Sequence, residues 1–209
     1  MTMAKVHTNH KLNIILFGPP GSGKGTQAEK LIEKFQLFHI STGDMFRYEL
    51  SNNTELGLLA RSYMDKGQLV PDQVTISMLE KRVEANPDTK GFIFDGFPRT
   101  VAQAQALDNF LAEQGQSITC LLELVVDEDE IVKRLMLRGQ TSGRADDVDE
   151  KTVRNRIYVY KTETSPVAAY YAEQEKALKI PGIGTIDDIF QNLCACIEII
   201  KKEKTAKMV

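Results

Sequence analysis

The sequence predicts an α/β fold in three layers, with a central parallel sheet of five strands and helices on both of its faces. The first observation behind this is an alternation along the chain. Short apolar runs are separated by segments with helical patterns, which is the order of elements in a parallel sheet covered by helices. The second observation is a glycine-rich turn at 18–26, which joins the first apolar run to the first helical segment.

The individual elements follow from these patterns. Apolar runs predict four strands, at residues 12–17, 38–40, 92–94 and 120–126. A fifth strand is expected near 178–180, where the following Pro-Gly-Ile-Gly at 181–184 leaves its end undefined. The segment 24–35 has a helical pattern. Thr185 is the predicted N-cap of a last helix that reaches about Lys202.

Composition indicates a globular protein with one domain. The chain has 209 residues, of which 42% are hydrophobic and 26% are charged. The net charge of −3 gives no indication of a nucleic acid or an anionic membrane as partner. No apolar run approaches the ~20 residues of a membrane span. Residues 1–11 are polar and are predicted to form a flexible N-terminal tail, and residues 12–209 form the single domain.

The three cysteines are too few for a disulfide framework. Cys194 and Cys196 are two residues apart on a predicted helix, so they point to different faces. We expect buried or half-buried thiols, and hence a cytoplasmic, reducing environment. No structural zinc is expected, because no further Cys or His is placed to complete a zinc site.

The sequence Gly-Pro-Pro-Gly-Ser-Gly-Lys-Gly-Thr at 18–26 indicates a phosphate-binding loop. Its glycines allow the backbone N–H groups to curl around an anion, and the following helix adds its N-terminus. Lys24 supplies a positive charge for the outer phosphates, and Thr26 suits a magnesium ligand or a phosphate contact. The loop departs from the usual pattern in one respect, because Gly25 stands where Ser or Thr is expected.

Arginines are the second signal, since five of them fall between 134 and 156. The planar guanidinium suits phosphate oxygens better than the point charge of a lysine. Arg134 and Arg138 are four residues apart and share one helix face. Arg154 and Arg156 lie about 200° apart around a helix, so only one of them can readily face a site. Spacing alone does not choose between these two.

Further polar features belong at the carboxyl ends of the strands, where open α/β sheets bind ligands. Asp95 ends the strand 92–94, which suits a carboxylate acting on a magnesium-bound water. Gly96 permits close approach of a ligand, and Arg99 can turn back toward it. The polar segment 41–70 is expected to hold short helical pieces. The segment 138–148 is expected to be a loop, and both segments are candidates for mobile flaps.

With these residues in view, the chain resembles the adenylate kinases. The shared motifs come in the family's order and span about residues 12–202. They stand at 18–26, 40–47, 67–72, 94–100 and 142–147. The glycine after Lys24 is normal for this family. The resemblance implies reversible transfer from ATP to AMP, giving two ADP, with Mg²⁺. It also implies an AMP-binding flap at 41–70 and a lid at 137–147, in the short form that lacks zinc-binding cysteines.

The resemblance also assigns roles to residues that match the family's motifs. The predicted ATP-binding residues are Gly21, Ser22, Gly23, Lys24, Gly25, Thr26, Arg134, Arg138 and Gly184. The predicted AMP-binding residues are Thr42, Arg47, Gln68, Leu69, Val70, Gly96, Phe97, Pro98, Arg99, Gln103, Arg144 and Arg156. The predicted catalytic residues are Lys24, Arg99, Arg138, Arg144 and Arg156. Mg²⁺ is expected near Asp95, through water, and near Thr26.

For some of these residues the resemblance also implies a particular interaction. Arg134 is expected to stack on the ATP adenine as a cation over a ring, and Gly184 to offer its carbonyl to the same base. Asp146 and Asp147 are expected to pair with the arginines in one state of the lid. The spacing before Arg156 is one residue longer than is usual in the family. This leaves Arg154 or Asn155 as alternatives to Arg156.

Two other functions are compatible with a phosphate loop. A UMP/CMP kinase has the same fold and a similarly short lid. A P-loop switch or ATPase would carry a guanine-reading Asn-Lys-x-Asp or a water-positioning residue, and the sequence has no such tetrapeptide. Thr42 and Gln103 favour AMP, since the pyrimidine kinases tend to have Ala and Asn there. The alternative for Gln103 is a cap of the helix 101–115. We expect a monomer with small-molecule nucleotides as its partners.

Overall fold

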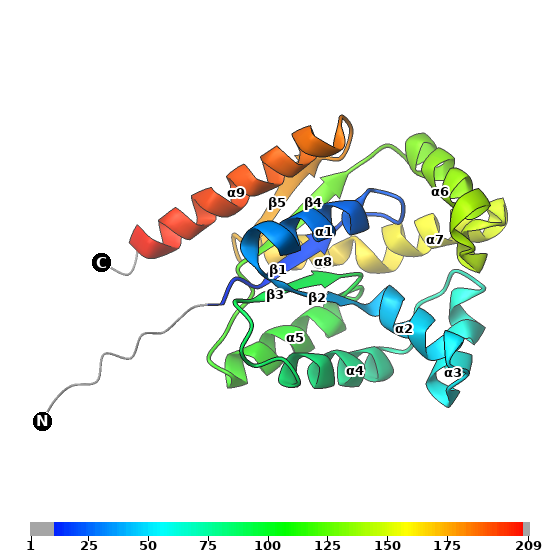
Figure 1. The fold of residues 1–209 in the computed structure, drawn as a ribbon, viewed down its shortest axis with the longest axis horizontal. Coiled ribbons are helices and arrows are strands. Elements are labelled where there is room, and N and C mark those ends of the chain that lie inside the picture. Colours follow the sequence, from blue (N-terminus) through cyan, green and yellow to red (C-terminus); the bar gives the residue numbers. More distant parts are fainter. Residues whose placement is uncertain (1–10, 207–209) are drawn as a thin grey trace, which may run out of the picture.

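The protein folds as a five-stranded parallel sheet between two layers of helices (Figure 1). This computed structural model describes residues 11–206, so the predicted N-terminal tail lies outside the described residues except for Lys11. The sheet order is β2-β3-β1-β4-β5, and all neighbouring strands are parallel. The strands are β1 (Ile14–Phe17), β2 (Phe38–Ser41), β3 (Phe92–Asp95), β4 (Cys120–Val125) and β5 (Ala177–Pro181).

Helices cover both faces, as the apolar runs predict. The α-helices are α1 (Lys24–Phe35), α2 (Thr42–Ser51), α3 (Glu55–Met64), α4 (Asp72–Glu84), α5 (Val101–Glu113), α6 (Glu128–Ser142), α7 (Glu150–Val159), α8 (Pro166–Ala172) and α9 (Ile186–Ala206). A 3-10 turn η1 (Ala145–Asp147) precedes α7, and a π-helical segment η2 (Tyr160–Thr164) follows it. None of the helices within residues 11–206 is long and apolar enough to cross a bilayer.

Successive strand residues feed two separate cores, because side chains alternate between the faces of a sheet. Ile14 and Leu16 pack with α1 and α9 on one face. Ile15 and Phe17 pack with α4, α5 and α8 on the other. A continuous apolar run such as 12–17 is therefore what a central strand with both faces covered requires.

Two helical pairs project beyond the carboxyl ends of the strands. The pair α2–α3 occupies the segment 41–70, as predicted, and α6–α7 stands beside it (Figure 1). The prediction of a loop at 138–148 is wrong for residues 138–142, because α6 continues to Ser142. Gly139 lies inside the helix without ending it, and Gly143 ends it by taking the left-handed conformation (φ 64°).

The remaining predictions differ from the structure only at the ends of elements. Strand β1 begins at Ile14 rather than Leu12, whose N–H bonds to the carbonyl of Lys90 in a loop. Strand β5 is longer than predicted and is paired with β4 along its whole length. The last helix begins after Thr185 as predicted. It carries Cys194, which is buried, and Cys196, which is half-buried.

Candidate functional site

A pocket of about 510 Å³ opens at the carboxyl edge of the sheet, between the loops after β1 and β3 and the two projecting helical pairs. It is lined by Lys24 and by six arginines, Arg47, Arg99, Arg134, Arg138, Arg144 and Arg156. The acidic lining residues are Glu29, Asp44, Asp95 and Asp146. The pocket is therefore rich in cations although the chain has a net charge of −3, which indicates an anionic ligand.

The phosphate loop connects β1 to α1 and presents the start of that helix to the pocket. Gly23 occupies the N-cap with a positive φ of 96° and has no side chain to cap the first N–H groups of α1. These N–H groups are available to an anion. Gly18 is needed for a different reason: a Cβ there would lie 2.7 Å from the carbonyl oxygen of Leu124 on the neighbouring strand.

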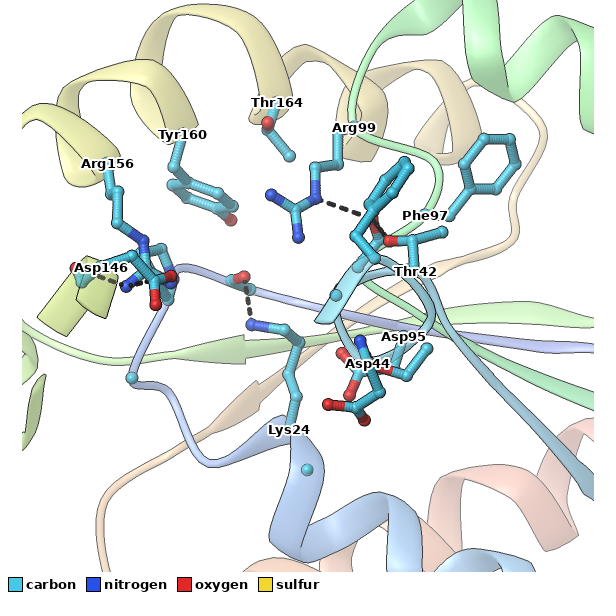
Figure 2. Close-up of a pocket in the computed structure, with 18 of the residues that line it drawn as sticks. Lys24, Thr42, Asp44, Asp95, Phe97, Arg99, Asp146, Arg156, Tyr160 and Thr164 are labelled. Atoms are coloured by element: carbon cyan, nitrogen blue, oxygen red, sulfur yellow. Dashed lines mark hydrogen bonds and ion pairs between the residues drawn. The ribbon is translucent and has the colours of Figure 1, made fainter. Parts of the chain in front are cut away.

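Lys24 extends from α1 toward the centre of the pocket (Figure 2). Its Nζ donates hydrogen bonds of 2.8 Å to the carbonyl oxygens of Gly18 and Pro19. Burial lowers the pKa of Lys24 to about 8; Asp95 opposes this shift, and nearby arginines add to it. An anion bound beside the ammonium group would favour its charged form, so binding of phosphate and protonation of Lys24 support each other.

Arg99 approaches the same space from the opposite side (Figure 2). Its Nε donates to the carbonyl of Gly96 at 2.7 Å, and the Thr42 hydroxyl donates to that carbonyl at 2.8 Å. Burial, together with the nearby charge of Arg156, lowers the pKa of Arg99 to about 10. A buried cation held among other cations is stabilised by an anionic ligand, so the position of Arg99 suits an anion in this pocket.

The expected pairing of Asp146 and Asp147 with the arginines is present. Asp147 is fully buried and accepts two bonds from Arg138, at 2.6 and 3.1 Å. Arg156 bonds to Asp147 as well and lies 3.0 Å from Asp146. Burial alone would raise the pKa of Asp147, but the bonds from Arg138 and the charge of Arg156 hold it below its usual value.

The structure also separates the two arginines that spacing left open. Arg156 lines the pocket with 18% of its side chain exposed. Arg154 points to the outer side of α7, where it pairs with Glu150 at 2.7 Å and is 58% exposed. Asn155 donates to the carbonyl of Lys66 at 2.6 Å and so ties α7 to the segment 41–70. Gly67 is needed at that contact, since a Cβ there would lie 2.8 Å from Cγ of Arg156.

Asp44 is a pocket residue that the sequence interpretation missed. It bonds to Arg47 on the same helix, and Arg144, just before η1, lies 3.8 Å from the same carboxylate oxygen. Burial would raise the pKa of Asp44, but bonds from Arg47 and Ser41 lower it overall. The spacing of three residues between Asp44 and Arg47 on a predicted helix was the signal that was available.

Tyr160 and Thr164 were also missed, and both line the pocket beside Arg99 (Figure 2). Tyr160 packs against Phe17, with 5.8 Å between the ring centroids. Burial raises the pKa of Tyr160, and the carboxylate of Glu123 raises it further. Tyr160 follows Arg156 by four residues and therefore shares its helix face, which the sequence would have allowed us to predict.

Most of the predicted binding residues line this pocket. Those brought together are Gly21, Gly23, Lys24, Gly25, Thr26, Thr42, Arg47, Gln68, Leu69, Val70, Asp95, Gly96, Phe97, Pro98, Arg99, Gln103, Arg134, Arg138, Arg144 and Arg156. Ser22 and Gly184, both within the described residues, are not brought to the pocket wall. The side chain of Ser22 is buried under the loop, 3.5 Å from Nζ of Lys24, and Gly184 lies in the loop after β5.

Gln103 lines the pocket and also caps α5, which was the alternative considered for it from the sequence; its contact with a base stays a prediction. Its Oε1 accepts from the backbone N–H of Arg99 at 2.7 Å, just before the helix begins. Its own N–H donates to the hydroxyl of Thr100, the N-cap residue. The pattern is a variant of the capping box, in which an N-cap Thr and a Gln three residues later satisfy early N–H groups.

Arg134 is anchored at the far end of the pocket. Its Nε donates to Glu130 at 2.7 Å, and an NH group donates to the carbonyl of Gly182 at 3.2 Å. The guanidinium plane is thus held between α6 and the loop after β5. This position suits a planar base lying against it.

The oxygen donors expected for a magnesium ion are present. Asp95 ends β3 with 14% of its side chain exposed, and both Asp95 and Thr26 line the pocket. A carboxylate and a hydroxyl beside a phosphate loop are the hard oxygen donors that Mg²⁺ prefers, so the site fits this ion. Within residues 11–206, no cluster of three or more Asp, Glu, His and Cys residues forms a protein-only metal centre.

A phosphate loop after β1, its lysine and a ring of arginines together define a P-loop phosphotransferase of the nucleotide-binding class. The family model described as adenylate kinase matches residues 16–176, and the chain belongs to this family. An adenylate kinase of Flavobacterium psychrophilum is 54% identical over 186 residues, which are 89% of this chain and 98% of that protein. An adenylate kinase of Bacteroides thetaiotaomicron is 50% identical over 187 residues, covering 90% of this chain and 98% of that protein.

Proposed function

We propose that the protein catalyses the reversible transfer of a phosphoryl group from ATP to AMP, giving two ADP, with Mg²⁺ bound to ATP. The observation that carries this proposal is the convergence of Lys24 and six arginines on one pocket. We assign ATP to an arm from the phosphate loop to Arg134, and AMP to an arm from Arg99 to Thr42 and Gln103. Membership of the adenylate kinase family supports the same activity and does not favour the UMP/CMP kinase alternative.

On the ATP side, residues 21–26 bind the phosphates through backbone N–H groups and the Lys24 charge. Arg134 stacks on the adenine, and Arg138 contacts the phosphates. The loop 182–184 contributes through backbone carbonyls, among which that of Gly184 serves the base. Support for this arm comes from the open N-terminus of α1 and from the anchoring of Arg134 to Gly182.

On the AMP side, Arg47 and Arg99 hold the phosphate, and residues 68–70 and 96–98 form the walls around the nucleoside. Thr42 and Gln103 face the base. Arg144 and Arg156 lie between the two arms and bridge the phosphates. Support comes from the cationic lining and from the bonds that fix Arg99 and Thr42 to the carbonyl of Gly96.

The reaction needs alignment and charge neutralisation rather than a general base, because the phosphate of AMP is already ionised near neutral pH. Lys24, Arg138 and Arg144 stabilise charge on the transferred group, and Arg99 orients the acceptor oxygen. Arg138 and Arg156 exchange their bonds to Asp147 for bonds to phosphate. Closure of the segments 41–70 and 137–147 excludes water, which would otherwise hydrolyse ATP.

When bound, Mg²⁺ neutralises phosphate charge, and Asp95 and Thr26 are the residues that would hold it, Asp95 through water. We expect an excess of chelator to abolish activity and added Mg²⁺ to restore it in full. Elemental analysis after dialysis should find far less than one zinc per chain. Stoichiometric zinc, or activity that survives chelation, would contradict this expectation.

We expect AMP to be preferred over CMP and UMP as acceptor. A wrong base cannot match the amide hydrogen and oxygen lone pair that Gln103 has left after its bonds to Arg99 and Asp72. A mismatched buried group costs ~1–3 kcal/mol, which gives about 10- to 100-fold discrimination. The three monophosphates at equal concentration, competing for one pool of ATP, provide the measurement. Phosphorylation of CMP or UMP as fast as AMP would rule out the assignment of the base site.

We propose further that the protein acts as a monomer in a reducing cytoplasm. The thiols of Cys194 and Cys196 suit a reducing compartment. Its partners are then the nucleotides alone.

A further inference from the structure

Gln103 is held by two anchors that differ in hydrogen-bonding character. Its Oε1 accepts from the backbone N–H of Arg99 at 2.7 Å, and its Nε2 donates to Oδ1 of Asp72 at 2.7 Å. The residue is buried, with 1% of its surface exposed, and still lines the pocket. One amide hydrogen and one oxygen lone pair of Gln103 therefore remain for a ligand.

Asp72 begins α4 and is not itself part of the pocket wall. Its second oxygen, Oδ2, accepts from the hydroxyl of Thr100 at 2.8 Å. Thr100 is the N-cap of α5, the helix that carries Gln103. The Asp72 carboxylate thus links the starts of α4 and α5. Thr100 holds it in place, and Gln103 is the residue that it orients.

A carboxylate only accepts hydrogen bonds, and a backbone N–H only donates them. If the amide of Gln103 turned over, its oxygen would face the Asp72 carboxylate and its NH₂ group would face the N–H of Arg99. Both contacts would be repulsive. The two anchors therefore permit one orientation of an amide that is otherwise free to adopt two.

We infer that Asp72 selects 6-aminopurine over 6-oxopurine nucleotides by fixing the orientation of the Gln103 amide. This rests on the proposed function, in which Gln103 faces the acceptor base. Adenine presents a 6-amino donor and an N1 acceptor, which match one oxygen and one N–H group. A 6-oxopurine presents an acceptor and an N1–H donor at these places, and an amide that turned over would accommodate it equally well. Asp72 is a positioning residue, since it acts through Gln103.

The test is Asp72→Asn, which keeps the shape but replaces an acceptor-only group with one that both donates and accepts. Inosine monophosphate is the probe, because it differs from AMP only at the 6-oxo group and N1–H. We expect the ratio of kcat/KM for AMP to that for inosine monophosphate to fall about tenfold, mainly through a lower KM for inosine monophosphate. Asp72→Glu, which only accepts, should retain most of the selectivity.

Asp65→Asn is the matched control, because Asp65 is an exposed acid seven residues before Asp72 that pairs with Arg61 and is not part of the pocket wall. It should leave the ratio unchanged. If Asp72→Asn is not folded by circular dichroism, Asp72→Ser takes its place with the same expectation. Calorimetric affinities for the two monophosphates should show the same change in ratio as the kinetics.

The two possible failures are distinguishable. A wild-type protein that does not phosphorylate AMP contradicts the proposed function. An active wild-type protein whose Asp72→Asn variant keeps the AMP preference, in kinetics and in affinity, contradicts the role of Asp72 alone.

Discussion

Replacement of Lys24 by Ala is expected to lower turnover by at least about 10²-fold while the fold is retained. The ammonium group faces the pocket and bonds to the Gly18 and Pro19 carbonyls, which water can serve when the side chain is removed. Its charge contributes mainly in the transition state, where negative charge develops on the transferred group. Steady-state kinetics with saturating ATP and AMP measure the effect.

Lys30→Ala is the control for Lys24→Ala. Lys30 lies on the same helix, where it pairs with Asp187 at 2.6 Å, and it is not part of the pocket. This variant should keep turnover within about twofold of the wild type. If Lys24→Ala is folded by circular dichroism and also keeps near wild-type turnover, the phosphate loop has been assigned incorrectly.

Replacement of Arg156 by Ala is expected to lower kcat/KM by about 10²-fold or more, and Arg154→Ala by less than about twofold. The two residues are on the same helix, but only Arg156 lines the pocket. Loss of Arg156 leaves the fully buried Asp147 bonded twice to Arg138, so the fold should persist. Asp146, which is 13% exposed, loses its ion pair with Arg156, so a lower melting temperature is expected.

Thermal melting curves for both variants separate a loss of stability from a loss of catalysis. Equally small kinetic effects of Arg154→Ala and Arg156→Ala would show that neither arginine contacts the phosphates. A larger effect of Arg154→Ala would reverse the assignment that the geometry supports.

Sequence patterns predicted the architecture well because they depend on burial. A run such as 92–94 is apolar on both faces, which only a covered parallel strand requires, and it forms β3. The predicted ends of helices and strands were less accurate, because the end of an element depends on single hydrogen bonds. Residues 138–142 are polar and include Gly139, but α6 continues through them to Ser142, and Gly143 ends it. The polar composition of residues 138–142 favoured a loop, but these residues continue the helix that precedes them.

The site residues could be predicted from the sequence where the ligand chemistry requires a particular residue type. Lys24 and the arginines line the pocket because phosphate chemistry needs their charge. The choice between Arg154 and Arg156 was not predictable, since it depends on how α7 is rotated against α6. Nor was Asp72, whose bond to Gln103 joins residues 31 apart in the chain. Such partners come together only through tertiary packing.

Phosphorus NMR of the wild-type protein with ATP, AMP and Mg²⁺ tests the central claim most directly. We predict that ATP and AMP disappear in equal amounts, that two ADP form for each pair consumed, and that inorganic phosphate does not accumulate. The same equilibrium should be reached from ADP alone, because the reaction is reversible. Release of phosphate without consumption of AMP would identify a hydrolase and contradict the account.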